Sequence, residues 1–209
     1  MGKRELVGVI LGAGDGVRMG GSKALLRIDG VTSVEAHAAR LREAGCARVV
    51  AAVRLSVLGA LAVVKQARLV VSGADDQAGS LAVVLSEERL LPDVIVIITP
   101  VDAAPVGQAT LERLVTEVER GALAATPRFE EKSGHPIVCR RSVLEPYMTT
   151  NATYPPLREV LRGLGSARVR IEVTDPRVVV DLDTPEDVVA LTGQPPHFLR
   201  TGRGESDAS

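Results

Sequence analysis

Residues 6–23 read LVGVILGAGDGVRMGGSK, and this stretch decides the fold because an apolar run passes directly into a segment crowded with glycine. The run from Leu6 to Leu11 has the length of a buried strand and is far too short to cross a membrane. Five glycines follow within ten residues, so backbone N–H groups can approach phosphate oxygens without a Cβ in the way. Arg18 and Lys23 add positive charge to the same loop. The stretch therefore predicts a strand that ends in a phosphate-binding loop.

The spacing within this loop excludes two common phosphate-binding motifs. A dinucleotide-binding fingerprint requires a glycine three residues after Gly14, where this chain has Val17. A P-loop requires a glycine directly before its lysine, where Ser22 stands. The loop belongs to neither class.

The composition favours one packed domain, with 45% hydrophobic and 24% charged residues in a chain of 209. The formal net charge of -1 provides no basic field for duplex nucleic acid, and an aromatic content of 2% leaves little for stacking on single strands. Cys46 and Cys139 lack the spacing of a zinc site or a disulfide framework. We expect a cytoplasmic protein, a monomer or a weak homodimer, that binds neither nucleic acid nor a membrane.

Apolar, β-branched runs alternate with segments of helical spacing along most of the chain. The run 94–98 is apolar at every position, which is typical of a strand covered on both faces in a parallel sheet. The alternation predicts an α/β fold, a Rossmann-like three-layer α/β/α sandwich with a mostly parallel central sheet. The further strands are expected at 49–53, 69–71 and 178–180, and the helices around 34–41, 111–118 and 157–164.

Residues 1–192 contain no linker that would divide them, so they are expected to form a single domain. Thr32 and Glu35 have the spacing of a capping box, and Thr184 followed by Pro185 marks another helix start. From residue 193 to 209 the composition shifts to Gly, Pro, Arg, Ser and Asp without periodicity. This shift predicts a disordered, mobile C-terminal tail at 193–209.

Acidic side chains follow two of the predicted strands. Asp102 lies just past the end of a buried strand, where open α/β sheets place their ligands, and a carboxylate there can hold Mg²⁺ together with phosphate oxygens and water. The alternative is that Asp102 only begins the turn before Pro105. Asp181 and Asp183 lie on the same side of an extended segment, and Asp181 is either a supporting residue or a hydrogen-bonded strand end.

The glycine-rich loop resembles the G-x-G-x-R-M-G-x-x-K signature of the MobA-like NTP transferases, and the resemblance extends over residues 6–192. It implies that the loop wraps the triphosphate of an NTP. The catalytic pair that it implies consists of Arg18, which holds the outgoing pyrophosphate, and Lys23, which neutralises the α-phosphate region. The implied nucleotide-binding residues are Leu11, Gly12, Ala13, Gly14, Gly16 and Gly20, with a weaker match at Gly79 and Ser80.

The same resemblance implies Mg²⁺ as the cofactor, with Asp102 and Asp183 as its ligands. The acidic ending at 181–187 and the element 134–136 (GHP) are similar to those of the CTP:molybdopterin cytidylyltransferase branch. In that branch His135 would lie beside the acceptor, and a purely structural histidine is the alternative. Ala13 stands where the guanylyltransferase branch usually has glycine, which favours CTP over GTP because its methyl group narrows the floor beneath the base.

The resemblance therefore implies a Mg-dependent nucleotidyltransferase. It would join the NMP moiety of an NTP, with CTP expected, to a phosphate-bearing acceptor such as molybdopterin and release pyrophosphate. The chain has no G-x-S-x-G elbow and no metal-ligating histidine pair, which excludes acyl transfer and zinc hydrolysis. The open alternatives are a sugar phosphate, methylerythritol phosphate or choline-type phosphate as acceptor, and a non-catalytic NTP-binding protein on the same scaffold.

Overall fold

A mostly parallel sheet occupies the centre of the chain, as the apolar runs predict. The computed structural model describes residues 4–14, 19–62, 64–150 and 153–200. Within these residues the main sheet has eight strands: β1 (Leu6–Gly12), β4 (Cys46–Val53), β5 (Arg68–Val71), β6 (Ile95–Pro100), β7 (Ala124–Phe129), β8 (Lys132–Ser133), β9 (Ile137–Arg140) and β10 (Arg168–Glu172). Their order is β10-β7-β9-β6-β1-β4-β5, with β8 paired to β7. β9 runs antiparallel to β6 and β7, whereas β1, β4, β5 and β6 are parallel to one another.

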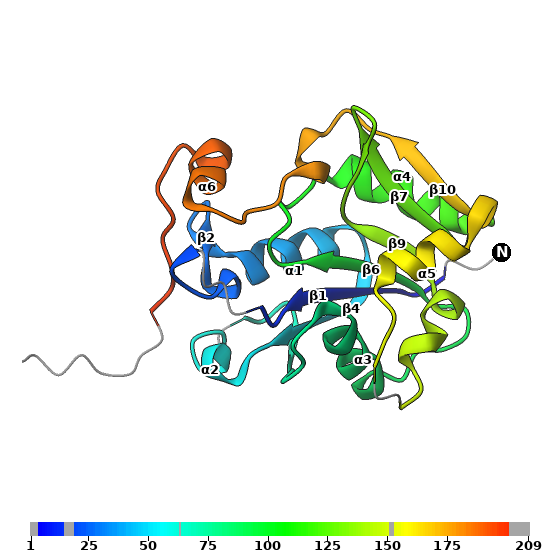
Figure 1. Cartoon of the computed structure of the whole chain (residues 1–209), viewed down its shortest axis with the longest axis horizontal. Helices are drawn as coiled ribbons and strands as arrows, with labels where there is room; N and C mark the ends of the chain where they lie inside the picture. The colour runs from blue at the N-terminus through cyan, green and yellow to red at the C-terminus, as the bar shows by residue number, and fades with distance from the viewer. Residues whose placement is uncertain (1–3, 15–18, 63, 151–152, 201–209) are drawn as a thin grey trace, which may run out of the picture.

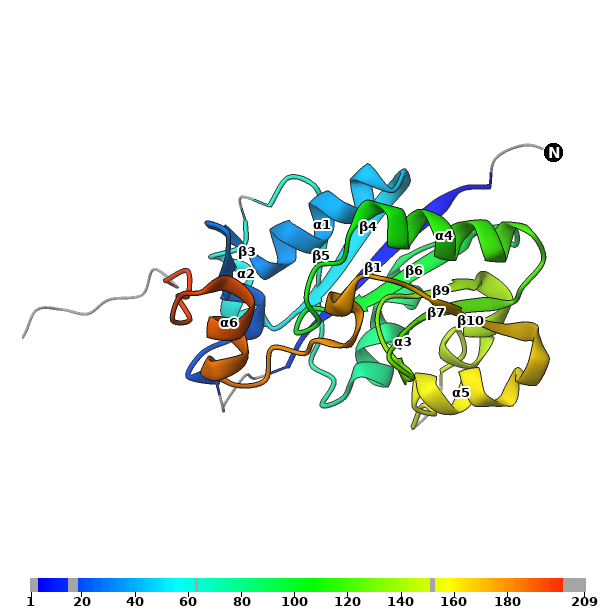
Figure 2. The same cartoon turned by 90° about the horizontal axis from the view of Figure 1, so that it is seen from above.

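Helices cover both faces of this sheet and complete the three predicted layers. The α-helices are α1 (Ser33–Glu43), α2 (Leu55–Leu58), α3 (Gln77–Glu87), α4 (Gln108–Glu119), α5 (Leu157–Gly163) and α6 (Pro185–Thr192). Figure 2 shows α1 and α4 on one face and α3 and α5 on the other. Each face has its own apolar cluster, which includes Leu41 and Leu114 on the first face and Leu81 and Leu161 on the second. The predicted α/β sandwich is confirmed.

The carboxyl ends of the central parallel strands lie at one edge of the sheet. β1 pairs with β6 up to Leu11 and Pro100, and with β4 up to Gly12 and Val53. A small hairpin, β2 (Arg27–Ile28) and β3 (Val31–Thr32), lies beyond this edge beside α6 (Figure 1). None of the helices in the described ranges is long and apolar enough to cross a bilayer.

The predicted strand at 178–180 is wrong. The chain instead forms the 3₁₀ helix η5 (Pro176–Val179). Pro176 presets φ at the start of this turn, and the Asp175 carboxylate accepts a hydrogen bond from the Arg177 N–H at 3.1 Å. Local capping therefore outweighs the β-propensity of three consecutive valines.

Residues 193–200 pack against the domain, whereas the sequence predicts a mobile tail from residue 193 onward. Leu26 and Phe198 form an antiparallel bridge, and the Leu199 N–H donates to the Leu25 carbonyl at 2.9 Å. The Phe198 ring packs against a small apolar cluster that also contains Leu182. One aromatic ring with backbone pairing is sufficient for this docking, and neither leaves a periodic pattern in the sequence. Residues 201–209 lie outside the described residues.

Candidate functional site

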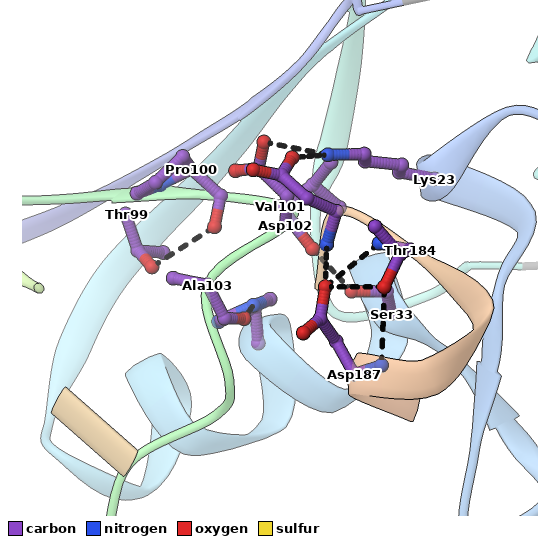
Figure 3. A network of polar contacts seen from close by, with 11 residues as sticks. Lys23, Ser33, Thr99, Pro100, Val101, Asp102, Ala103, Thr184 and Asp187 are labelled. Carbon is purple, nitrogen blue, oxygen red and sulfur yellow. Dashed lines mark hydrogen bonds and ion pairs between the residues drawn. The ribbon is translucent and has the colours of Figure 1, made fainter. Parts of the chain in front are cut away.

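Three charged side chains meet at the carboxyl edge of the sheet, and we call them the charged corner: Lys23, Asp102 and Asp183. The Lys23 Nζ donates to Asp102 Oδ2 at 3.2 Å and to Asp183 Oδ1 at 2.5 Å (Figure 3). The two carboxylates lie 79 and 160 residues after Lys23 in the sequence. The Lys23 side chain is only 12% exposed, so solvent screens this cluster less than an ordinary surface ion pair.

Helix α1 fixes the backbone on both sides of Asp102. The Ser33 hydroxyl donates to the Val101 carbonyl at 2.6 Å, and His37 Nε2 donates to the Ala103 carbonyl at 2.9 Å. Both side chains are buried in the first turns of α1, where the predicted capping box of Thr32 and Glu35 is present. Because the carbonyls flanking Asp102 are fixed by neighbours that cannot move without disturbing the core, its carboxylate has a defined position.

An extended segment, residues 180–183, brings the second carboxylate to the first. The Ala104 N–H donates to the Val180 carbonyl at 2.9 Å, and the Leu182 N–H donates to the Asp102 carbonyl at 2.7 Å. Leu182 is fully buried, so apolar burial anchors the segment. Because side chains alternate along an extended backbone, Asp183 points away from this core contact and toward Lys23.

The start of α6 fixes the backbone of Asp183. Thr184 is the N-cap and forms a capping box with Asp187. The Asp187 Oδ2 accepts hydrogen bonds from the backbone N–H of Thr184 at 2.8 Å and of Asp183 at 3.0 Å (Figure 3). These hydrogen bonds lower the pKa of the Asp187 carboxyl. Asp187 therefore completes the capping box of α6 and also contacts the backbone of Asp183 directly.

The docked C-terminal segment supports the turn that carries Lys23. This turn is the 3₁₀ helix η2 (Lys23–Leu25), and the Arg27 N–H that follows it donates to the His197 carbonyl at 2.7 Å. Phe198 lies so close to Gly21 that a Cβ on Gly21 would be 3.0 Å from the ring. The predicted loop residue Gly20 has a φ of +74°, a left-handed conformation that favours glycine.

Burial and charge compete around the charged corner. Burial disfavours the charged form of Lys23, but the hydrogen bonds and charges of Asp183 and Asp102 outweigh it and raise the pKa of Lys23. Burial lowers the pKa of His37 to about 4, so this imidazole is neutral at pH 7 with its proton on Nε2. Burial, with the charges of Asp102 and Asp183, raises the pKa of Asp181.

The donor set of the charged corner fits a hard divalent cation. The Lys23 ammonium already bridges one oxygen of each carboxylate, so both face a single compact positive charge. Among the described residues, no three or more His, Cys, Asp or Glu side chains gather into a metal site. The chain thus offers Asp102 and Asp183 and leaves other coordination positions to phosphate oxygens and water, as is usual for Mg²⁺.

A pocket of about 140 Å³ lies beside the charged corner. It is bounded by the end of β1, the start of α3 and the loop after β6. Ser80, buried in α3, shares a hydrogen bond with the hydroxyl of Ser72 at 3.1 Å. Of the residues predicted to bind nucleotide or phosphate, those lining this pocket are Leu11, Ala13, Gly14, Ser80 and Lys23.

Three of the other predicted residues, Gly12, Gly20 and Gly79, do not line this pocket. Gly12 is buried at the end of β1, where a Cβ would lie 3.0 Å from the Ala52 carbonyl oxygen. Gly79 lies in the first turn of α3, and its N–H donates to Asp76 Oδ1 at 2.7 Å. Gly16 and Arg18 lie outside the described residues.

A larger pocket of about 490 Å³ adjoins the smaller one, because Leu11, Asp76 and Gln77 line both. The predicted acceptor residue His135 lines the larger pocket. Burial lowers the pKa of His135, and its Nδ1 is buried with no hydrogen-bond partner among the described residues. A buried polar atom without a protein partner calls for another one, such as an ordered water or a bound ligand.

Gly134 allows the chain to place His135 in the pocket. A Cβ on Gly134 would lie 1.7 Å from the Val178 carbonyl oxygen, so only glycine fits at this position. The same carbonyl accepts a hydrogen bond from the His135 N–H at 2.7 Å. In the 134–136 element, Gly134 is therefore required by the close approach of the backbone, and His135 lines the larger pocket.

Several residues of the site are absent from the sequence predictions. Ser33 and His37 act on the Asp102 loop through the backbone, and their only sequence signal is their place after a capping box. Asp76 has a recognisable N-cap position, but nothing in the sequence indicates that it borders two pockets. Basic residues of the larger pocket come from separate elements and share no motif. The missed residues are Ser33, His37, Asp76, Gln77, Arg158 and Arg168.

Comparison with protein families gives a match to the MobA-like NTP transferase domain over residues 8–173. This range runs from β1 to just past β10 and includes both pockets, whereas Asp183 and α6 follow it. No curated protein matches the chain.

Several solved structures have the same fold. Rv0371c from Mycobacterium tuberculosis H37Rv has a TM-score of 0.71 at 23% identity, and the match covers 91% of this chain and 99% of Rv0371c. The structure of its manganese complex has a TM-score of 0.69 at 21% identity, with 92% of this chain and 100% of that chain covered. The Methanothermobacter nucleotidyl transferase Mth528 has a TM-score of 0.72 at 20% identity, covering 91% and 97%. The 4-diphosphocytidyl-2C-methyl-D-erythritol synthase from Anaerococcus prevotii has a TM-score of 0.70 at 11% identity, covering 91% and 95%.

Proposed function

Because the chain belongs to the MobA-like NTP transferase family, we propose that it transfers the nucleoside monophosphate of an NTP to a phosphate-bearing acceptor and releases pyrophosphate. The observation that carries this proposal is the charged corner, which lies beside a pocket that opens onto a second, larger one. Group transfer requires two molecules bound next to each other with a charge-stabilising group at their junction. We assign the smaller pocket to the nucleotide and the larger pocket to the acceptor.

In the proposed step, an ionised oxygen of the acceptor phosphate forms a bond to the α-phosphorus of the NTP. The bond from the α-phosphorus to its bridging oxygen breaks, and the electron pair leaves with pyrophosphate. No proton is removed from the nucleophile, so no general base is required. Lys23 neutralises charge on the α-phosphate and Arg18 holds the leaving pyrophosphate. Two carboxylates keep the Lys23 ammonium charged and oriented before substrate arrives.

Asp102 and Asp183 are the proposed ligands of a divalent cation. Mg²⁺ is the expected ion, and the manganese in the Rv0371c complex makes Mn²⁺ the second ion to test. Such a cation, when bound, supplies positive charge to phosphate oxygens. Lys23 can give up one of its two carboxylate contacts to make room, because its four-carbon stem is flexible.

The proposed nucleotide is CTP. Ala13 is only 6% exposed, and its methyl group is part of the smaller pocket's lining. One methyl group in a pocket discriminates by about 1 to 3 kcal/mol, so Ala13 is proposed as one contributor to the selection.

The acceptor is proposed to contact His135 in the larger pocket. The unpartnered Nδ1 supports this role, because a phosphate or hydroxyl of the acceptor would satisfy it. Molybdopterin is the acceptor suggested by the resemblance of the 134–136 element and the acidic ending. Sugar phosphates, methylerythritol phosphate and choline-type phosphates remain the alternatives to be tested.

The test combines nucleotide binding with turnover. The thermal stability of the protein is measured with each of the four NTPs and with Mg²⁺ or Mn²⁺, and pyrophosphate release is then followed across the candidate acceptors. We expect the largest stabilisation from CTP and pyrophosphate release with one phosphorylated acceptor class. Stabilisation by an NTP without pyrophosphate release on any acceptor would instead identify a binding protein.

Ala13→Gly tests the nucleotide assignment separately. We expect the variant to use purine NTPs better relative to CTP than the unmodified protein does. Preferential use of GTP by the unmodified protein would overturn the CTP proposal. An unchanged ranking in Ala13→Gly would show that another feature selects the base.

A further inference from the structure

The larger pocket contains two arginines that the proposed transfer step does not use. Arg158 lies on α5 and Arg168 begins β10. Both elements lie on the side of the molecule away from α6 and the β2–β3 hairpin, which flank the charged corner (Figures 1 and 2). Neither arginine lines the smaller pocket, and neither Lys23 nor Asp102 lines the larger one. The arginines and Lys23 therefore line different pockets.

The guanidinium of Arg168 is oriented but not neutralised. Its Nε and Nη2 donate to the Thr126 hydroxyl at 3.2 and 3.0 Å, and Thr126 is only 1% exposed. No carboxylate of the described residues lies within 4.0 Å of Arg168 or Arg158, whereas Arg48 and Arg177 each pair with acids. Burial and the neighbouring Arg170 lower the pKa of Arg168.

Apolar side chains form part of the wall of this pocket. Leu81, Ile98 and Leu161 come from α3, β6 and α5, and all three belong to the core of that face. The lining therefore combines polar groups at the border with the smaller pocket, where Asp76 and Gln77 line both, with apolar side chains and two guanidinium groups. An arginine held by a neutral hydroxyl keeps N–H donors available for a carboxylate or a phosphate.

We infer that the far end of the larger pocket is a second anion site, in which Arg168 and Arg158 bind a carboxylate or phosphate of the acceptor other than the phosphate that attacks the nucleotide. This inference rests on the proposed function for the identity of the ligand as acceptor. It specifies the acceptor class as a molecule with an anionic group at each end and an apolar or flat middle. Thr126 is a positioning residue, because it acts on the ligand only through Arg168.

The experiment compares ligands with one and two anionic ends. Binding of hexyl phosphate is measured by calorimetry against the bisphosphates of butanediol, hexanediol and octanediol, and against a hexyl phosphate that carries a terminal carboxylate. We expect at least one two-ended ligand to bind about tenfold more tightly than hexyl phosphate, because it gains a charge-assisted hydrogen-bonded pair. The affinities of the carboxylate-terminated and phosphate-terminated ligands show which anion the site prefers.

Matched variants test which residues produce the higher affinity for ligands with two anionic ends. In Arg168→Gln the advantage of the second anion should fall to about twofold or less, and Arg158→Gln should lose part of it. Arg170→Gln and Arg162→Gln remove the same charge from neighbouring positions outside the pocket lining and should retain the advantage. Thr126→Val should retain binding of hexyl phosphate while weakening the preference for two-ended ligands.

Two outcomes overturn the inference: equal affinity for one-ended and two-ended ligands, or an advantage that survives Arg168→Gln. All measurements are repeated with a non-hydrolysable CTP analogue and Mg²⁺. Failure of the analogue to bind counts against the proposed transfer and leaves the comparison of ligands readable, so the two failures are distinguishable.

Discussion

The charged corner and the larger pocket use charge in opposite ways. In the charged corner the Lys23 ammonium is compensated by two carboxylates, and buried neighbours fix the backbone of both. In the larger pocket Arg158 and Arg168 have no acidic partner among the described residues. A preorganised corner suits chemistry that is the same for every substrate, whereas unpaired cations make binding depend on the charge that a ligand brings.

The largest expected effect comes from removing a carboxylate of the charged corner. Asp102→Asn or Asp183→Asn keeps the side-chain volume but removes a negative charge, so kcat should fall by about 10² to 10⁴ with little change in fold. The measurement is pyrophosphate release at saturating NTP and Mg²⁺. Asp93→Asn, an exposed change outside the site, is the control. Near-normal turnover of either variant would remove that residue from the metal site.

The pH dependence of stability tests the role of His37, the buried residue whose hydrogen bond fixes the backbone beside Asp102. His37 has a pKa of about 4 in the folded protein against about 6.5 in the unfolded chain. Its contribution to the free energy of unfolding is therefore fully present above pH 6.5 and is lost as the pH falls toward 4. The shift corresponds to about 3 kcal/mol. The free energy of unfolding in urea, measured at about pH 7 and about pH 4, should change less in His37→Asn than in the unmodified protein.

His197→Asn is the matched control for this measurement, because His197 is exposed and its imidazole makes no hydrogen bond to the described residues. It should retain the full pH dependence. Equal pH dependence in His37→Asn and the unmodified protein would show that His37 does not titrate in this way.

Replacing Lys23 tests its ammonium both as the counter-charge of Asp102 and Asp183 and as a competitor of the divalent cation. Because the sequence places Lys23 on a surface loop, it predicts that replacing this residue leaves the stability of the protein nearly unchanged. The contacts of Lys23 with Asp102 and Asp183 change this expectation. In Lys23→Met the two carboxylates face each other without a counter-charge, so stability in chelator should fall by about 1 to 2 kcal/mol. Added Mn²⁺ should then stabilise the variant more than the unmodified protein, because no ammonium competes for the site.

Lys132→Met is the control, since Lys132 is exposed and lines neither pocket. The readout is the melting temperature with and without Mn²⁺. A variant that shows neither the loss in chelator nor the larger gain with Mn²⁺ contradicts the assignment of both carboxylates to one cation.

The smallest expected effect concerns the docked C-terminal segment. Phe198→Ala removes a partly buried ring that supports Gly21 and the turn of Lys23, so stability should fall by about 1 kcal/mol and the KM for NTP should rise. The preference for two-ended ligands should not change, because Phe198 does not line the larger pocket. Leu55→Ala, which removes an apolar side chain that is 70% exposed, should alter neither property. Equal loss in both assays would mean that the two regions are not independent.

Much of this molecule follows from local sequence patterns. The non-alternating run 94–98 predicts a doubly covered strand and is confirmed by β6, and the capping box predicted at Thr32 and the helix start predicted at Thr184 are both present. The placement of Asp102 after β6 also follows, because the carboxyl ends of parallel strands meet at one edge. Local patterns fail at 178–180, where Asp175 and Pro176 favour a turn that β-propensity alone does not reveal.

The sequence by itself determined the class of fold, the glycine-rich loop and the positions of the acidic residues, because apolar periodicity, turn chemistry and capping act over a few residues. Only the tertiary structure decided that Lys23 bridges Asp102 and Asp183, that Phe198 supports the turn of Lys23, and that Arg158 and Arg168 share one pocket. These contacts join segments far apart in the chain, and burial selects them from many that local patterns permit. A single sequence has no short-range signal for such a choice, because the free energy that favours it exists only when the whole core is packed.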